Sequence, residues 1–259
     1  MKKINLVIDI GNTHIVVGIY TEGNLFHSWR LRTDKESTED EYFAILRILF
    51  SEEKISFNDF NICALASVVP ALTQVFAHLI VKYFDCKIEI ITGNSNLGLT
   101  FPMANPNYIG ADLIVNAFAA WKKYKTNCLI CDFGTATTIQ LVGADGYFYG
   151  VSISPGVRTS ANSLFNIASL LSNIGLQTPD KILGTNTKSA LQSGIVLGNA
   201  FMVDGIIKKI RQDYKHLEDI KTIATGGIAK LICESTKEIE IVDKTLTLDG
   251  LQLICERLK

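Results

Sequence analysis

The alternation of apolar and polar positions predicts a chain built from short strands and helices. Three short strands are predicted at the start of the chain, at residues 4–8, 15–20 and 25–31. Gly11-Asn12 and Gly23-Asn24 separate these strands, and such pairs are turn residues that hairpins need. The opening segment is therefore predicted to be a three-stranded β-meander.

The rest of the first half alternates between helical and strand patterns. A helix with Thr38 as its cap is followed by a strand, a helix that begins near Pro70, another strand and a last helix. The predicted ranges are 39–50, 62–68, 70 onward, 87–91 and 108–124. Such alternation is typical of an α/β chain.

The pattern then starts again in the second half. Three predicted strands, separated by turns, precede two long helical segments and a closing strand–helix–strand–helix unit. The predicted ranges are 128–131, 137–142, 147–153, 158–174, 188–214, 222–225, 239–242 and 248–258. The order of elements in the first half is thereby repeated.

The repetition is visible in the residues themselves, because VIDIGNTHIVVGIY in the first half matches CDFGTATTIQLVGA in the second. Each segment holds an apolar strand, an aspartate, a glycine turn and a β-branched strand. Asp9 and Asp132 are in register, 123 residues apart. A repeat of this kind indicates duplication of a half-molecule, and we expect one domain at residues 1–117 and the other at residues 118–259.

Composition and charge limit the kinds of molecule that this protein is expected to bind. Of 259 residues, 47% are hydrophobic and 20% are charged, as in a folded chain with a substantial core. The formal net charge is −1 and basic residues form no run longer than a pair such as Lys122-Lys123, which argues against a nucleic-acid partner. No run of about 18 uninterrupted apolar residues occurs, and the first residues do not form a signal peptide. We therefore expect no membrane segment and a cytoplasmic location.

Six scattered cysteines include Cys128 and Cys131, whose spacing could suggest a metal or redox site. They lie on a predicted strand, where positions three apart point to opposite faces. The sequence offers no second Cys/His pair to complete a tetrahedral site. Buried free thiols are the favoured interpretation.

The two Asp-Gly turns are the candidate phosphate sites. A glycine lets the backbone turn tightly and approach a ligand, and the following amides, with a hydroxyl from Thr13 or Thr135, can donate to phosphate oxygens. The carboxylates of Asp9 and Asp132 would repel an anion unless a cation mediates, and Mg²⁺ is the expected one. Two such turns facing each other across a cleft would hold nucleotide phosphates from both sides. The alternative is that each is an ordinary hairpin turn.

Two further features bear on the site. Gly226-Gly227, after a predicted strand, would let an adenosine lie flat against the backbone, although Gly-Gly is also a common turn. Asp112, in the first turns of a predicted helix just past Gly110, is the candidate base for the attacking hydroxyl. Its alternative role is to complement the helix dipole. The segment GTNTKS at residues 184–189 lacks the Gly-Lys pair of a P-loop and is rejected as one.

The motifs DIGNT, NPNYIGAD, DFGTATT, SISPG, TKSALQSG, TGG and LTLDGL follow one another over residues 4–258. In combination they resemble the type III pantothenate kinases. The resemblance implies a duplicated actin-like (ribonuclease H-like) α/β fold, in which each domain holds a mixed five-stranded sheet flanked by helices. It also implies ATP-dependent phosphorylation of the primary hydroxyl of pantothenate, the first step of coenzyme A biosynthesis. The implied partners are Mg²⁺, a monovalent cation (K⁺ or NH₄⁺) and a second subunit, in a homodimer whose subunits complete the active site.

The resemblance assigns site residues motif by motif. The ATP phosphate loop would comprise Asp9, Ile10, Gly11, Asn12, Thr13, His14, Ile15 and Val16. Thr135 would also contact ATP, with Gly226 and Gly227 at the adenosine. Asp112 would be the proton acceptor, while Asp132 would hold the monovalent cation and Asp9 would lie beside the metal. The pantothenate site would be lined by Met103, Gly110, Ala111, Asp112, Leu113 and Thr187.

Two residues depart from the family pattern. Leu113 stands where the family usually has an arginine that meets the pantothenate carboxylate, and Met103 where it commonly has a substrate-contacting tyrosine. Loss of one charge-assisted contact would cost about 1.5–3 kcal/mol of binding free energy, and Arg158 is a candidate replacement. Two alternatives to an active pantothenate kinase stay open: a paralogue acting on another small hydroxy compound, and a non-catalytic regulatory protein of the same fold.

Overall fold

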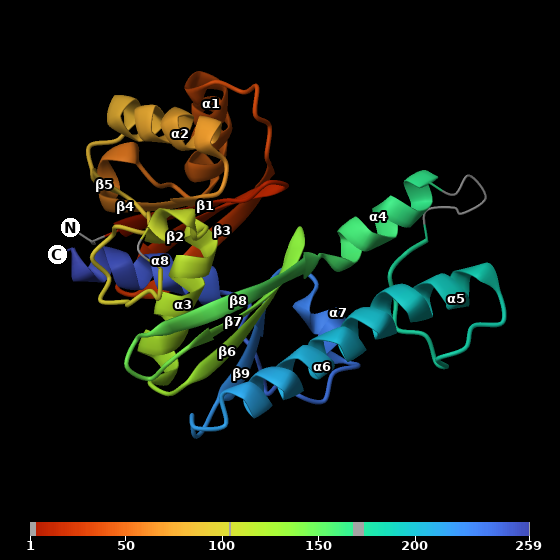
Figure 1. Ribbon diagram of the computed structural model, residues 1–259. Helices are drawn as coiled ribbons and strands as arrows, with labels where there is room; N and C mark the ends of the chain where they lie inside the picture. Colours follow the sequence, from red (N-terminus) through yellow and green to blue (C-terminus); the bar gives the residue numbers. More distant parts are fainter. Residues whose placement is uncertain (1–3, 104, 168–173, 259) are drawn as a thin grey trace. The chain divides into compact units, whose positions relative to one another are not determined.

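The structure, a computed structural model, describes residues 4–103, 105–167 and 174–258. The chain divides into two compact units (Figure 1). Unit 1 comprises Met1–Gly98, Met103–Ala119 and Leu246–Lys259, and unit 2 comprises Leu99–Pro102 and Ala120–Thr245. Each unit is built on one five-stranded sheet.

The sheet of unit 1 is mixed, in the order β3-β2-β1-β4-β5. Its strands are β1 (Ile4–Ile10), β2 (His14–Thr21), β3 (Asn24–Arg32), β4 (Phe60–Ser67) and β5 (Lys87–Ile90). The first three form the predicted antiparallel meander, and β4 pairs in parallel with β1 and β5. Strand β1 is thus central, and its residues Leu6, Val7 and Ile8 are fully buried.

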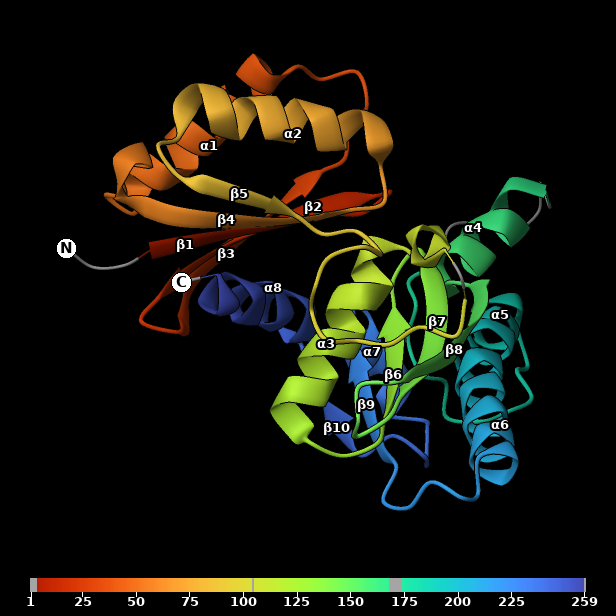
Figure 2. The same ribbon diagram turned by 60° about the vertical axis from the view of Figure 1, so that its left-hand side comes forward.

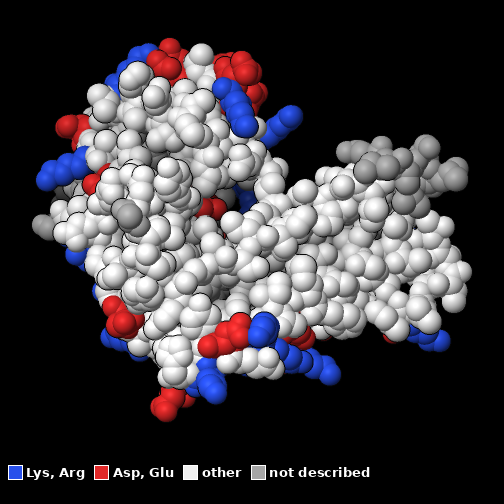
Figure 3. Space-filling view, viewed as in Figure 1, with Lys and Arg blue, Asp and Glu red and all other residues white. Residues whose placement is uncertain are grey.

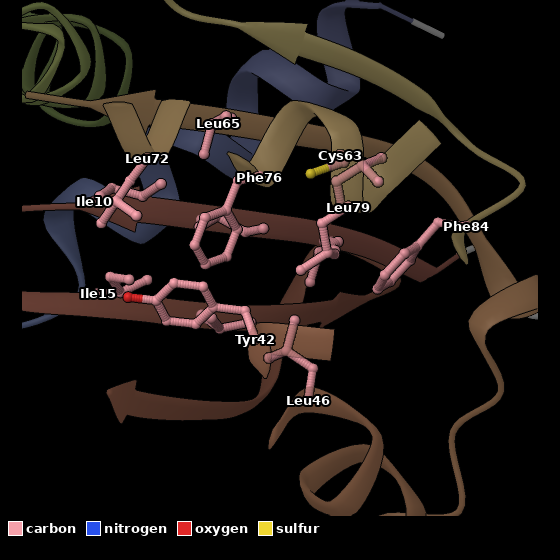
Figure 4. Close-up of a cluster of buried hydrophobic side chains, with 14 of the residues drawn as sticks. Ile10, Ile15, Tyr42, Leu46, Cys63, Leu65, Leu72, Phe76, Leu79 and Phe84 are labelled. Atoms are coloured by element: carbon pink, nitrogen blue, oxygen red, sulfur yellow. The ribbon is translucent and has the colours of Figure 1, made fainter. Parts of the chain in front are cut away.

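Helices cover both faces of this sheet (Figure 2). The helices of unit 1 are α1 (Glu39–Glu52), the 3₁₀ turns Phe57–Asp59 and Pro106–Tyr108, α2 (Pro70–Tyr83), most of α3 (Ala111–Tyr124), and α8 (Leu246–Arg257). On one face, α1 and α2 bury their apolar side chains against Ile10 and Ile15 (Figure 4). On the other face, Gln252 of α8 accepts a 3.0 Å hydrogen bond from Asn5 of β1.

The predicted cap of α1 is confirmed. The side chain of Thr38 accepts a hydrogen bond from the amide of Glu41, and the Glu41 carboxylate accepts one of 2.7 Å from the Thr38 amide. This reciprocal capping box satisfies two backbone donors that the first turn of a helix leaves without partners. The local sequence therefore fixes where α1 begins.

Unit 2 repeats the sheet of unit 1. Its strands are β6 (Cys128–Phe133), β7 (Ala136–Val142), β8 (Phe148–Pro155), β9 (Lys221–Thr225) and β10 (Ile241–Val242). Their order is β10-β9-β6-β7-β8, with β6, β7 and β8 antiparallel and β9 and β10 parallel to β6. The same mixed order around a central first strand occurs in both units, so the predicted duplicated fold is confirmed.

The helical segment predicted at residues 188–214 contains a π-helical turn. The helices of unit 2 are α4 (Val157–Ile167), α5 (Thr187–Gln192), the π-helix η3 (Ser193–Leu197), α6 (Gly198–Asp213) and α7 (Ala229–Cys233). α5, η3 and α6 form one helix, whose residues Val196, Val203 and Ile207 are fully buried in the core of unit 2. The predicted helix at 158–174 extends partly beyond the described residues, since 168–173 lie outside them.

The two units differ from the expected domains, 1–117 and 118–259, in where the C-terminal segment belongs. Residues Leu246–Lys259 belong to unit 1, because α8 packs on β1 and β4. In this packing, Cδ1 of Leu248 on α8 lies 3.4 Å from the position that a Cβ on Gly18 of β2 would occupy. The change from unit 1 to unit 2 within α3 falls at Ala119, close to the expected boundary.

Among the described residues, Thr187–Asp213 is the one helix that could cross a membrane by length and composition, with a mean hydropathy of 1.4 in its most apolar window. Half of that window is buried inside the protein. A core helix passes the same test, and the burial of Val196, Val203 and Ile207 indicates that this helix serves as one.

The cysteine prediction is confirmed for Cys128 and Cys131. Both are free thiols and both are fully buried on β6. Burial raises the pKa of Cys128 to about 12 and raises the pKa of Cys131 further. Neither thiol is therefore ionised near neutral pH, which excludes reactive thiolate chemistry at this pair.

Candidate active site

The first glycine turn joins β1 to β2 in unit 1. Asp9, next to the end of β1, pairs with Val16 of β2 and is half-buried. The amide of Gly11 donates to the carbonyl of His14 at 2.9 Å and closes the turn. Its exposed residues are Asn12, Thr13 and His14. The turn is thus open to a ligand at the surface of unit 1.

Three hydrogen bonds fix the backbone of this turn within unit 1. The hydroxyl of Thr33 donates to the carbonyl of Gly11 at 2.7 Å, and its amide donates to the carbonyl of Thr13 at 3.1 Å. On the other side, the amide of Val68 donates to the carbonyl of Ile10 at 3.0 Å. A backbone held in this way is preorganised for an anion.

The second glycine turn joins β6 to β7 in unit 2. The amide of Gly134 donates to the carbonyl of Ala136 at 3.0 Å. The carbonyl of Thr135 accepts hydrogen bonds from the amide of Gly156 at 3.1 Å and from the hydroxyl of Thr159 at 2.7 Å. A Cβ on Gly156 would lie 2.4 Å from the carbonyl oxygen of Gly134, so only glycine fits there.

The two turn aspartates occupy equivalent places in their units. Each is the penultimate residue of the central strand, with an antiparallel hairpin partner on one side and a parallel strand on the other. The second turn is one residue shorter, because Ile10 pairs with Ile15 whereas Phe133 pairs with Thr137. The repeat seen in the sequence is therefore a repeat of local structure.

The glycine pair after β9 lies against the second aspartate. Gly226 has a φ of +96°, and a Cβ there would lie 2.6 Å from Oδ1 of Asp132. Glycine is consequently required at this position. Gly227, next in the chain, is exposed. Unit 2 thus brings the predicted cation ligand and the predicted adenosine motif together.

Asp112 is the second residue of α3, in the part of that helix that belongs to unit 1. The helix begins at Ala111 rather than at residue 108, since a 3₁₀ turn precedes it. A Cβ on Gly110 would lie 2.5 Å from Oδ1 of Asp112 and 3.4 Å from a methyl carbon of Val68. Because the Val68 amide also bonds to Ile10, the start of α3 lies beside the first glycine turn.

The environment of Asp112 suits a proton acceptor. Burial raises the pKa of its carboxyl above the ordinary aspartate value, and the amides of Leu113 and of Asp112 itself offset part of the rise. The Leu113 amide donates to Oδ1 at 2.8 Å. A carboxylate whose pKa is raised is a stronger base, which is what general base catalysis near neutral pH requires.

The predicted pantothenate residues are divided between the two units. Gly110, Ala111, Asp112 and Leu113 are consecutive at the start of α3. Leu113 is only 7% exposed, so its side chain packs inward, while Met103 is 38% exposed on the loop before that helix. Thr187, exposed at the first position of α5, belongs to unit 2.

Metal binding was expected at Asp9 and Asp132. Within the described ranges, no group of three or more His, Cys, Asp or Glu side chains is arranged to hold a metal ion. Mg²⁺ in phosphoryl-transfer sites usually binds one or two carboxylates together with phosphate oxygens and water. A single half-buried aspartate at each turn fits that mode of binding, in which the nucleotide supplies most of the ligands.

Sequence reasoning missed the residues that support the turns. Thr33 binds the first turn from the end of β3, 22 residues further along the chain than Gly11. Thr159 binds the second turn from α4, 24 residues beyond Thr135. No local pattern marks either threonine, and only the folding of the chain brings them to the turns.

An open groove of about 710 Å³ in unit 2 is lined by other residues. They are Tyr124, Lys230, Cys233, Glu234, Ile241, Val242, Asp243, Lys244 and Thr245. None of the predicted site residues is among them. The groove therefore adds nothing to the assignment of the phosphate turns or of Asp112.

A duplicated mixed sheet with a glycine turn after each central strand defines the actin-like class of kinases and ATPases. Solved structures support this class. A putative 2-dehydro-3-deoxygalactonokinase from Sinorhizobium meliloti matches with a TM-score of 0.59 at 11% identity, over 98% of this chain and 96% of its own. A putative Baf family transcriptional activator from Campylobacter jejuni matches with a TM-score of 0.59 at 18% identity, over 98% of both chains. At these identities the likeness concerns the fold.

Sequence comparisons identify the family within that class. The family model described as type III pantothenate kinase matches residues 5–209. A type III pantothenate kinase of Exiguobacterium sibiricum is 41% identical over 98% of this chain and 99% of its own length. One of Desulfosudis oleivorans is 41% identical over 96% of this chain and 97% of its own. The chain belongs to the type III pantothenate kinase family.

Proposed function

We propose that this protein transfers the terminal phosphoryl group of ATP to the primary hydroxyl of pantothenate, the first step of coenzyme A biosynthesis. Membership of the family makes it a kinase. The observation that carries the proposal is the arrangement in unit 1, where Val68 contacts both the strand before the first glycine turn and the start of α3. The candidate phosphate turn and the candidate base, Asp112, therefore lie side by side there.

Asp112 would accept the proton of the attacking hydroxyl. In phosphoryl transfer the transition state is loose, so this carboxylate mainly orients the nucleophile. Its raised pKa strengthens it as a base. Gly110 and Ala111, directly before it, would line the substrate pocket, and Thr187 would contact pantothenate from α5.

The nucleotide would bind through both glycine turns. Residues Asp9 to Val16 would hold its phosphates, with Thr135 as a further contact and Gly226-Gly227 at the adenosine. Asp9 would serve as a ligand of Mg²⁺, which when bound neutralises phosphate charge. Asp132 would hold a monovalent cation, K⁺ or NH₄⁺, and its carboxylate next to Gly226 supports that role.

The active form would be a homodimer whose subunits complete each other's sites. Unit 2 supports this proposal with large apolar side chains that are exposed in the single chain: Ile153 at 63%, Leu183 at 81% and Phe201 at 53%. Figure 3 shows few charged side chains on the surface over α4 and α5. A second copy would remove such side chains from water.

A second candidate function rests on two substitutions. Leu113 and Met103 stand where the family usually has an arginine and a tyrosine, and the buried Leu113 side chain presents no charge to an acid. A paralogue acting on another small hydroxy compound, or a non-catalytic regulatory protein, would fit a lost carboxylate contact. The two glycine turns fit all three functions, so they favour neither the paralogue nor the regulatory protein over a pantothenate kinase.

A coupled assay of ATP consumption separates these functions. With Mg²⁺ present, a pantothenate kinase consumes ATP only when pantothenate is added, and faster with K⁺ than with Na⁺. Glucose and N-acetyl sugars serve as alternative acceptors. Turnover of one of these without turnover of pantothenate favours the paralogue, and no turnover with any acceptor favours the regulatory protein.

A further inference from the structure

Two arginines lie on β3, on the same face of the sheet as Asp9 and next to the first glycine turn. Residues of β3 alternate, so Trp29 and Leu31 pack against the core under α1 and α2 while Arg30 and Arg32 point to the opposite face. Both arginines are exposed, and neither side chain makes a hydrogen bond or ion pair with another described residue. Two guanidinium groups are therefore available on that face.

The strand register places Arg30 in line with Asp9. Asp9 pairs with Val16, and Val16 pairs with Arg30. Directly paired residues share a face, and neighbouring strands lie about 4.8 Å apart. One half-buried valine thus separates the two charged residues, a distance that the long side chain of arginine can reach across.

Arg32 is paired with a residue of the turn itself. It pairs with His14, whose carbonyl closes the turn by accepting from Gly11. The next residue, Thr33, makes the two hydrogen bonds that fix Gly11 and Thr13. The end of β3 is therefore attached to the turn, and Arg32 cannot move away from it independently.

The other end of the same face is covered. α8 contacts it at Asn5, Gly18 and Tyr20, through Gln252, Leu248 and Asp249 respectively. None of these strand residues is charged. On this face of β1, β2 and β3 the arginines consequently lie at the open end, beside the turn and Asp9.

We propose that Arg30 and Arg32 form a cationic wall of the nucleotide site and bind the phosphate chain of the ATP held by the first glycine turn. This inference rests on the proposed function only for the presence of a nucleotide at that turn. Guanidinium groups match phosphate oxygens in bidentate geometry. They also offset the negative charge that Asp9 places beside the phosphates.

Titration calorimetry with MgATP, MgADP and adenosine tests the proposal on the intact protein. Arg30→Ala and Arg32→Ala should each raise the Kd of MgATP about 10- to 100-fold, as expected for loss of a hydrogen bond to a charged group. The Kd of adenosine should not change. Arg30→Lys should recover only part of the loss, because lysine lacks the planar fork.

The matched control is Arg47→Ala. Arg47 is exposed on α1, on the other face of the sheet, and its replacement removes the same charge from the same unit. Its Kd for MgATP should equal that of the wild type. Thermal unfolding should give all variants the wild-type Tm, which excludes misfolding as the cause of weaker binding.

Three results would overturn the proposal. The first is a Kd for MgATP within twofold of wild type in both Arg30→Ala and Arg32→Ala. The second is an equal loss in Arg47→Ala. The third is a raised KM for pantothenate with unchanged MgATP binding, which would assign the arginines to the carboxylate of the acid instead.

Failure of the proposed function is distinguishable from these results. A wild-type protein that binds MgATP but does not phosphorylate pantothenate contradicts the substrate assignment, while the arginine variants can still be compared by their Kd values. A wild-type protein that binds no MgATP overturns the arginine proposal together with the kinase function.

Discussion

The carboxyl group of Asp112 lies in a largely buried position, where the charged form is disfavoured. Burial raises its pKa, so the folded protein binds the proton at this site more tightly than the unfolded chain does. The stability that this proton contributes is fully present below the ordinary aspartate pKa. It is lost as the pH rises through the raised pKa of the folded state.

Replacement by asparagine should therefore stabilise the protein at pH 7. The variant Asp112→Asn cannot ionise and avoids the cost of a buried charge, so its Tm should exceed that of the wild type. The difference should vanish below about pH 3.9, the ordinary aspartate pKa. Thermal unfolding across this pH range measures it, with Asp85→Asn, at an exposed position of unit 1, as the control that changes nothing. A lower Tm for Asp112→Asn at pH 7 would contradict this reading.

At the residue scale, the sequence predicted the residues that the proposed chemistry needs but not the residues that support them. The aspartates, the glycine turns and Asp112 were predicted as site residues because their residue types suggest phosphate and proton chemistry. Thr33 and Val68 were not, since their roles come from strand pairing and from the packing of Gly110. Non-local contacts of this kind leave no local signal.

At the scale of elements, the glycine after β9 is a steric requirement. Gly226→Ala would combine a left-handed φ of +96° with a Cβ 2.6 Å from the carbonyl oxygen of Phe133. We expect a loss of about 1–3 kcal/mol in the free energy of unfolding, measured by urea denaturation.

Gly205→Ala is the control for the Gly226 variant. Gly205 lies within α6, has no heavy atom within 4 Å of a built Cβ, and should gain about 0.5–1 kcal/mol when replaced. Equal stability of the two variants would show that Gly226 is not constrained.

The π-helix η3 begins where buried polar side chains bind the preceding loop. Gln192 donates to the carbonyl of Gly175 at 2.7 Å, and the hydroxyl of Ser193 donates to the carbonyl of Ile182. Gln192→Ala should cost about 1–2 kcal/mol of unfolding free energy, because a buried hydrogen bond is lost. Lys188→Ala, at an exposed position of the same helix, should cost less than about 0.5 kcal/mol. Equal losses in urea denaturation would contradict the role of Gln192.

Periodicity predicted this helix but could not predict its π-turn. The apolar spacing over residues 188–214 fits an α-helix, whereas the π-turn begins where Gln192 and Ser193 bind the loop before Thr187. The early start expected for α3 was wrong for a related reason. Its first turn is replaced by a 3₁₀ turn at Pro106–Tyr108, which a pattern of apolar positions does not distinguish from an α-helix.

At the scale of the whole molecule, the repeated order of elements predicted the duplicated sheets, and the structure confirms both. No pattern in the sequence indicates that α8 belongs with unit 1, since its contacts with β1 and β4 join residues more than 170 positions apart. A linear division of the chain cannot represent a helix that returns to the first sheet.

The proposed homodimer makes a prediction at this scale. Leu183→Asp places a charge on an apolar side chain that is 81% exposed in the single chain, and it should shift the protein from dimer to monomer in light scattering. Activity should fall with the dimer, because in the proposed homodimer each site is completed by the partner. Val81→Asp, at a side chain 75% exposed on α2 of unit 1, should leave the dimer intact. A dimer that survives Leu183→Asp would contradict this placement.

The most direct test of the kinase assignment is mass-spectrometric detection of phosphopantothenate after incubation with ATP, Mg²⁺, K⁺ and pantothenate. The wild type should form the product, and Asp112→Asn should form it about 10²- to 10⁴-fold more slowly, as expected for loss of a general base. No product from the wild type, or equal rates for the two proteins, would contradict the account.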